Sequence, residues 1–92
     1  MATRFLICGR VQGVGYRDWC RREAERRGLR GTVRNLPDGR VEAVVVGSPE
    51  ETDAMLEACR KGPPAARVDS IGLDVADDPP VTGFVVLRTP DA

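Results

Sequence analysis

Two short alternating runs that flank a proline–aspartate–glycine turn constrain the fold of this chain more than any other feature. Residues 29–35 and 40–45 both alternate with a period of two, which is typical of half-buried β-strands. Between them, Pro37 presets the φ angle of a tight turn, and Gly39 accepts the positive φ that closes it. The sequence therefore predicts a β-hairpin whose first strand ends at Asn35.

Strand and helix patterns on either side of the hairpin predict the remaining elements. Tyr16, Cys20 and Ala24 recur at a helical spacing, and Gly28 follows in the position favoured for a left-handed helix cap. Ser48 opens a second helix with a capping box. The expected elements are a strand over 3–9, a helix over 16–27, the hairpin strands over 29–35 and 40–45, a helix over 49–61, and strands over 67–75 and 84–88.

This order of elements is β-α-β-β-α-β with a short extra C-terminal strand, the split arrangement of ferredoxin-like α+β folds. We expect one domain over residues 1–92, built as an α/β sandwich with a mainly antiparallel sheet and two helices on one face. The first strand and the first hairpin strand are joined by a helical crossover, so they run parallel. Their C-terminal ends then meet at one edge of the sheet, which brings the loop after the first strand close to Asn35.

That loop lies in the stretch GRVQGVGYR, residues 9–17, and it is rich in glycine. Glycines let a backbone turn its N–H groups inward without Cβ clashes, and the first turn of a helix adds unpaired N–H groups and the positive end of its dipole. Such a loop can cradle a tetrahedral anion, and Arg17 stands where a guanidinium can clamp it. A glycine-rich turn can equally serve only to connect a strand to a helix, so both interpretations stand at this point.

The charge balance and the aromatic content argue against a nucleic-acid-binding protein. Lysine and arginine together number 14, as do aspartate and glutamate, so the formal net charge is zero rather than basic. Four aromatic residues are too few to build a stacking platform for bases. No run of about 18 apolar residues and no N-terminal signal pattern is present, so we expect a cytoplasmic protein that does not enter the membrane.

The sequence contains no histidine and only three cysteines, Cys8, Cys20 and Cys59, at wide spacing. Neither a zinc site nor a disulfide framework is expected from this pattern, and we predict that the three cysteines are small core residues. An enzyme with this composition works without the imidazole group that usually moves protons in catalysis. No metal and no cofactor are therefore expected.

VQGVGYR followed by GTVRNLPDGRVE resembles the two motifs of the acylphosphatases, V-Q-G-V-x-[FY]-R and G-x-V-x-N-x-x-D-G-x-V-E, and the likeness extends over essentially the whole chain. The resemblance implies hydrolysis of acyl phosphates, without metal, on a ferredoxin-like fold. It places the catalytic arginine on Arg17 and the catalytic asparagine on Asn35. Thr32 departs from the pattern, because many members carry an aromatic residue there, and we expect it to alter the wall of the site. The phosphate cradle that it implies consists of the backbone N–H groups of Gln12, Gly13, Val14, Gly15, Tyr16 and Arg17.

The chemistry that the resemblance implies suits a chain without histidine. The carboxylate of an acyl phosphate leaves without needing a proton, so positioning and charge stabilisation are the main tasks left to the protein. Arg17 and the amide cradle would hold the phosphoryl oxygens, while the Asn35 side chain can orient one attacking water. The side chain of Gln12 has two open interpretations, a part of the site or a structural pin for the loop.

Three other functions compete with this prediction. A noncatalytic phosphate-binding module would keep the loop and Arg17 but would not need Asn35. A domain of the larger hydrogenase-maturation proteins that handle carbamoyl phosphate would be followed by further domains, whereas we expect this 92-residue chain to act alone, as a monomer. An RNA-binding ferredoxin-like domain conflicts with the neutral charge. The identity of the physiological acyl phosphate and the role of the C-terminal tail, residues 89–92, stay open.

Overall fold

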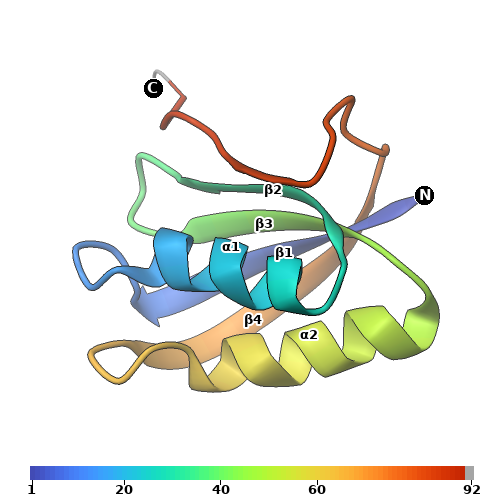
Figure 1. Cartoon of the computed structure of the whole chain (residues 1–92). Coiled ribbons are helices and arrows are strands. Elements are labelled where there is room, and N and C mark those ends of the chain that lie inside the picture. Colours follow the sequence, from blue (N-terminus) through green and yellow to red (C-terminus); the bar gives the residue numbers. More distant parts are fainter. Residues whose placement is uncertain (91–92) are drawn as a thin grey trace.

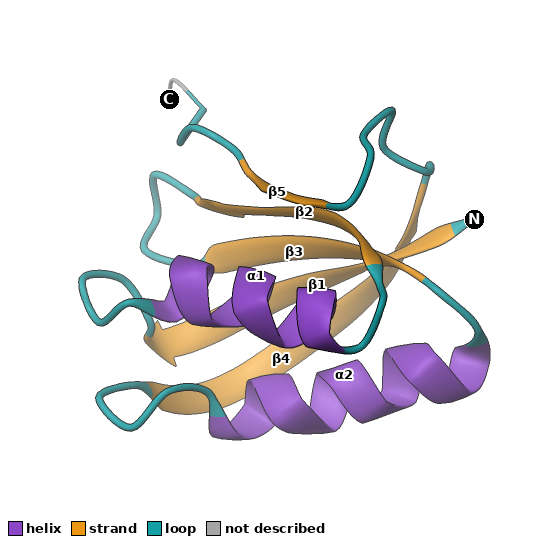
Figure 2. Ribbon diagram, in the orientation of Figure 1, coloured by secondary structure: helices purple, strands orange, loops and turns teal. Residues whose placement is uncertain are grey.

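Both helices cover the same face of a five-stranded sheet, as Figures 1 and 2 show. The computed structural model describes residues 1–90. Along the sheet the strands are ordered β4-β1-β3-β2-β5, with antiparallel pairing everywhere except between β2 and β5. The elements are β1 (Ala2–Arg10), α1 (Tyr16–Arg26), β2 (Arg30–Asn35), β3 (Val41–Val46), α2 (Pro49–Lys61), β4 (Arg67–Ala76) and β5 (Phe84–Val86).

The predicted ferredoxin-like α+β arrangement is confirmed, with small differences at the ends of elements. The first helix ends at Arg26, one residue earlier than expected, because Arg27 has left helical geometry and Gly28 adopts a φ of 70°. The N–H groups of Gly28 and Leu29 then bond back to the Glu25 and Ala24 carbonyls, which closes the helix in a Schellman motif. The last strand stops at Val86 rather than at residue 88.

The hairpin turn and the capping box of the second helix, both predicted from the sequence, are present in the structure. The N–H of Gly39 donates to the Leu36 carbonyl at 3.2 Å, and the N–H of Leu36 donates to the Arg40 carbonyl at 2.8 Å, which closes the hairpin turn. At the start of α2, the backbone N–H of Glu51 bonds to the Ser48 hydroxyl, and the Glu51 carboxylate accepts from the Ser48 N–H. Among residues 1–90, no helix is both long and apolar enough to cross a membrane.

The hydrophobic core fills the space between the helices and the inner face of the sheet. Phe5 and Ile7 of β1 are fully buried there, and Cys20 and Cys59 join them from α1 and α2. Burial of each large apolar side chain contributes about 1.5–3 kcal/mol. The prediction that all three cysteines are core residues is wrong for Cys8, which is only partly buried. It lies one position beyond Ile7, so the strand alternation turns it toward the face that the helices leave uncovered.

The sheet brings three strand ends to one edge. Val41 pairs with Ile7 on one side and with Asn35 on the other, so β1 and β2 both run antiparallel to β3 and therefore parallel to each other. β5 runs parallel to β2, with Val86 beside Val33. The C-terminal ends of β1, β2 and β5 consequently lie together, and the glycine-rich loop follows the first of them.

Candidate active site

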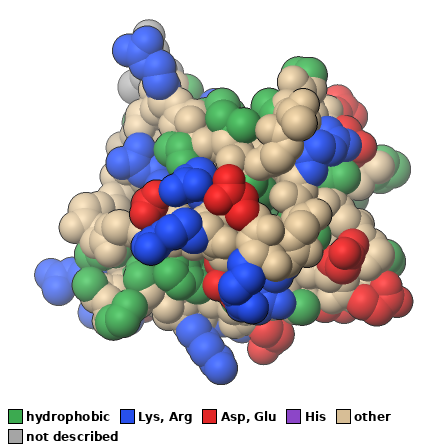
Figure 3. Space-filling model, viewed as in Figure 1, with side chains coloured by type: hydrophobic (Ala, Val, Ile, Leu, Met, Phe, Trp, Pro, Cys, Tyr) green, Lys and Arg blue, Asp and Glu red, His purple; other side chains and the backbone are tan. Residues whose placement is uncertain are grey.

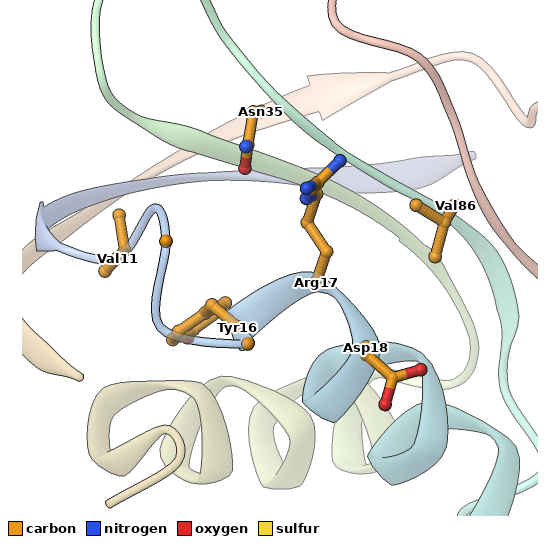
Figure 4. A pocket seen from close by; sticks show the side chains of 8 residues that line it. Val11, Tyr16, Arg17, Asp18, Asn35 and Val86 are labelled. Carbon is orange, nitrogen blue, oxygen red and sulfur yellow. The ribbon is translucent and has the colours of Figure 1, made fainter. Parts of the chain in front are cut away.

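A cavity of about 300 Å³ opens at this edge of the sheet, and Figure 4 shows the side chains around it. Its walls come from the loop after β1, the first turn of α1, the last residue of β2 and the last residue of β5. The loop and α1 are consecutive, whereas the ends of β2 and β5 are distant from them in sequence and meet them because the three strand ends share an edge. The lining residues are Val11, Gly13, Gly15, Tyr16, Arg17, Asp18, Asn35 and Val86.

The loop that borders the cavity presents backbone rather than side chains. Gly13 and Gly15 have φ angles of 74° and 79°, which only glycine adopts without strain, and a Cβ on either would meet nothing within 4 Å. Gly15 is also the N-cap of α1 and offers no side-chain acceptor to the first turn. Within residues 1–90, the first bond along the helix is that of the Trp19 N–H to the Gly15 carbonyl, at 3.1 Å. The N–H groups of Tyr16 and Arg17 therefore remain available to an anion.

The guanidinium of Arg17 extends from the start of α1 toward Asn35 (Figure 4). No carboxylate of residues 1–90 lies within ion-pair distance of it. The neighbouring carboxylate of Asp18 points away, and it is bound by Arg21 at 2.7 Å and Arg22 at 3.2 Å. The hydrogen bond from Arg21 lowers the pKa of Asp18, so this carboxylate stays ionised and engaged on the helix surface. Arg17 is thus a cation whose charge faces the cavity.

The helix surface beside the cavity is covered by paired charges. Figure 3 shows basic and acidic side chains interspersed over the helical face of the molecule. On α1, Glu23 binds Arg26 and Arg27, while Arg21 also reaches Glu25. The charges of these pairs neutralise one another at the helix surface. Among residues 1–90, Arg17 differs from the other arginines of α1 because it has no carboxylate partner.

Asn35 ends β2 at the opposite wall of the cavity. Its Oδ1 atom is buried, and no donor among residues 1–90 bonds to it. Leaving a buried acceptor unpaired costs about 1–3 kcal/mol, so the position is stabilised when a water or a ligand supplies the missing hydrogen. Asn35 and Arg17 lie far apart in sequence but face the same space (Figure 4).

The side chains of Gln12 and Tyr16 hold the loop rather than line the cavity with polar groups. The Nε2 of Gln12 donates to the carbonyls of Leu36 at 2.8 Å and Arg40 at 2.9 Å, which confirms the structural interpretation of this side chain. The Tyr16 ring is buried, and its hydroxyl donates to the Cys59 carbonyl at 2.6 Å. Tyr16 therefore offers the cavity its backbone and not its phenol.

The structure brings together most, but not all, of the residues predicted for the phosphate cradle. Gly13, Gly15, Tyr16 and Arg17 line the cavity with Asn35, whereas Gln12 and Val14 do not. The Val14 side chain packs against the hydrophobic core. Within residues 1–90, no group of three or more acidic or cysteine side chains is arranged to hold a metal ion.

A sequence profile described as Acylphosphatase matches residues 3–86. The chain belongs to the acylphosphatase family. It is 56% identical over 85 residues to the acylphosphatase of Azorhizobium caulinodans, and the match covers 91% of each chain. Membership in this family makes the chain an enzyme that hydrolyses acyl phosphates.

Solved structures agree with this assignment. The crystal structure of the acylphosphatase from Bacillus subtilis superposes with a TM-score of 0.86 at 33% identity, covering 94% of this chain and 97% of that one. The crystal structure of T. kodakarensis HypF superposes with a TM-score of 0.80 at 34% identity, but the match covers 98% of this chain and only 12% of HypF. The match to the Bacillus subtilis acylphosphatase thus extends over nearly the full length of both chains, whereas the match to HypF covers only a small part of the HypF chain.

Three cavity residues of this acylphosphatase were missed by sequence reasoning. Val11 and Asp18 flank the predicted phosphate cradle, residues 12–17, and their place next to it is the signal that marks them. Val86 has no local signal, because it reaches the cavity only through the parallel pairing of β5 with β2. The expectation that Thr32 alters the wall of the site is wrong. Thr32 pairs with Val44 and Val85 and lies outside the cavity, since alternation directs it to the other face of β2.

Proposed function

We propose that the Arg17 guanidinium and the backbone N–H groups of the cavity-lining residues between Gly13 and Arg17 bind the phosphoryl group of an acyl phosphate, and that Asn35 orients the attacking water. The amides at the start of α1 and the Arg17 guanidinium, for which residues 1–90 supply no partner, support the first role, because both stabilise negative charge that grows on phosphoryl oxygens. Donors that are already in place when the charge develops lower the barrier without a reorganisation cost.

In the reaction, the oxygen of the water attacks phosphorus in line with the bond to the acyl oxygen. That phosphorus–oxygen bond breaks, and its electron pair leaves with the carboxylate. The proton of the attacking water passes to a phosphoryl oxygen of the substrate, so the products are a carboxylate and inorganic phosphate. Asn35 accepts a hydrogen bond from the water and holds it, but an amide is too weak a base to take the proton.

The Oδ1 of Asn35, which is buried and has no hydrogen-bond donor among residues 1–90, carries this proposal. Asn35 lies in the cavity wall opposite Arg17, and a buried acceptor without a partner is uncommon for a strand residue that only ends a hairpin. A water that reached this oxygen would satisfy it and stand beside the phosphoryl group held by the loop. A phosphate-binding module without catalysis gives no reason for this arrangement.

Hydrolysis of benzoyl phosphate by the purified protein in excess EDTA tests the proposal. We expect turnover that EDTA does not reduce and that collapses in Asn35→Ala, while the variant keeps its circular dichroism spectrum. Turnover that needed a metal would contradict the metal-independent mechanism. A folded wild-type protein with no turnover would favour the phosphate-binding module instead.

We also propose that the chain acts in the cytoplasm as a monomer on small acyl phosphates, without nucleic acid and without a cofactor. The equal numbers of acidic and basic residues support the absence of a polyanionic partner. Val86 is an exposed apolar wall of the cavity and makes no polar contact that would select one acyl group, so varied acyl groups fit. Light scattering after size exclusion tests the oligomeric state.

A further inference from the structure

We infer that Gln12 is a positioning residue, which holds the phosphate loop in line with Asn35 by tying it to the turn after β2. This inference rests on the proposed function of Arg17 and Asn35. It concerns how the two halves of the active site, the loop on one side and Asn35 on the other, keep their relative placement.

The side chain of Gln12 uses both of its amide hydrogens in the connection. One goes to the Leu36 carbonyl at 2.8 Å and the other to the Arg40 carbonyl at 2.9 Å. These are the same two carbonyls that close the hairpin turn, since Leu36 accepts from Gly39 and Arg40 accepts from Leu36. Gln12 therefore binds both ends of the turn between β2 and β3.

Val14, between Gly13 and Gly15, holds the glycine part of the loop by packing against the hydrophobic core. A Cβ on Gly13 or Gly15 would meet nothing within 4 Å, so the space beside either glycine is open. Val11, which is 1% exposed, anchors the loop at its start, and the Tyr16 hydroxyl anchors its end to α2. Gln12 provides the hydrogen bonds that join the loop to the hairpin itself.

The hydrogen bonds of Gln12 hold the backbone directly beside Asn35. Leu36, whose carbonyl Gln12 binds, directly follows Asn35. The Asn35 Oδ1 atom has no partner among residues 1–90, so its hydrogen bonding does not tie it to the loop. The backbone therefore sets the distance from the phosphate cradle to Asn35. The Gln12 side chain fixes that backbone by joining the loop to the turn after Asn35.

Loss of the two Gln12 hydrogen bonds should slow turnover without weakening phosphate binding. The free N–H groups of Tyr16 and Arg17 and the Arg17 guanidinium lie on α1, so the phosphoryl group still binds when the turn that follows Asn35 is released from the loop. The water held by Asn35 then loses its in-line placement, and a displacement of about 1 Å in such an arrangement costs on the order of 100-fold in rate. We therefore expect the rate of turnover to fall while phosphate affinity is retained.

Two variants of similar length to glutamine test this. Gln12→Met removes both donors, and Gln12→Glu places a carboxylate oxygen against the two carbonyls. We expect each to lower kcat for benzoyl phosphate by about 10-fold or more, while the inhibition constant of inorganic phosphate changes by less than about threefold. The shift in Tm that inorganic phosphate produces, measured on the same samples, establishes that each variant is folded and binds.

Arg30→Met is the matched control. Arg30 also donates from its side chain to two backbone carbonyls, those of Pro79 at 3.0 Å and Val81 at 3.4 Å, but it holds the loop before β5. It should lower stability without changing kcat.

If the Gln12 variants keep kcat within twofold of the wild type, the inference is wrong. It is also wrong if kcat and phosphate affinity fall in proportion, because Gln12 would then support the cradle alone. Wild-type protein without turnover would refute the proposed function itself, so the two failures are distinguishable.

Discussion

The hydroxyl of Tyr16 donates a 2.6 Å hydrogen bond to the backbone carbonyl of Cys59 in the protein interior. Tyr16 is the first residue of α1, and Cys59 lies in the last turn of α2, where helix carbonyls have no partner within the helix. One phenol therefore satisfies the end of one helix and fixes the beginning of the other beside the cavity. Burial, with the nearby Cys59 thiol, raises the pKa of Tyr16 well above its usual value, so the hydroxyl keeps its proton and the bond persists.

Replacing Tyr16 by phenylalanine should destabilise the protein. The ring still fills its place, but the Cys59 carbonyl is left buried without a partner, which costs about 1–3 kcal/mol. Urea denaturation followed by circular dichroism measures this loss. Activity of the folded variant should persist, since the phenol does not enter the cavity, and an unchanged free energy of unfolding would show that the bond contributes nothing.

Gly62→Ala should be more harmful than Gly28→Ala. Both glycines have positive φ, 64° at Gly62 and 70° at Gly28, and Gly62 combines it with a ψ of −169°, a region essentially restricted to glycine. The backbone strain of an alanine is therefore about 1–2 kcal/mol at Gly28 and on the order of 1–3 kcal/mol at Gly62. At Gly28 the added Cβ meets nothing within 4 Å, whereas at Gly62 it would lie 2.8 Å from the Tyr16 ring. Thermal denaturation of the two variants measures how much stability the strained backbone and the contact with the ring cost together at Gly62. Equal losses of stability in the two variants would contradict this prediction.

The elements that the sequence predicted well are those with local causes. The hairpin turn follows from Pro37 and Gly39, the second helix begins at the Ser48 capping box, and Gly28 terminates the first helix. Each signal acts within a few residues, so it can be recognised without the rest of the fold. The parallel course of β1 and β2 also followed from element order alone, and it placed Asn35 beside the loop.

Features that depend on contacts between distant residues could not be predicted in the same way. Val86 enters the cavity because β5 pairs in parallel with β2, which no local pattern indicates. The partners of the Gln12 side chain are backbone carbonyls of another loop, and a carbonyl carries no sequence signal. The order of the elements predicted that the loop with Arg17 lies near Asn35, whereas the catalytic roles of these two residues were predicted through the family motifs.

Acid should remove a contribution to stability that comes from Glu23. The hydrogen bond from Arg26, aided by Arg27, lowers the pKa of Glu23 below its usual value. A carboxyl whose folded pKa is lowered stabilises the protein above its unfolded pKa, about 4.3, and this contribution disappears as the pH falls through the folded pKa. Wild-type protein should therefore exceed Glu23→Gln in stability at pH 6, and the difference should shrink toward pH 3.

Urea titrations at several pH values measure this difference. Glu57→Gln is the control, because Glu57 forms a comparable ion pair with Arg60 but its side chain is 74% exposed, against 17% for Glu23. Exposed pairs contribute little to stability. A difference between the wild type and Glu23→Gln that stayed constant from pH 6 to pH 3 would contradict the assignment.

Arg17→Ala and Asn35→Ala should both abolish most activity, but for reasons that binding experiments can distinguish. Removing one donor that stabilises a transition state typically costs about 10²–10³ in rate. Arg17→Ala takes away a charge that faces bound phosphate, so it should weaken inhibition by inorganic phosphate together with turnover. Asn35→Ala removes the water's acceptor, so it should lower kcat and leave phosphate inhibition nearly unchanged. Arg60→Ala, which removes an exposed arginine on α2 paired with Glu57, should match the wild type in both assays. Near-full turnover in Arg17→Ala or in Asn35→Ala would remove that residue from the mechanism.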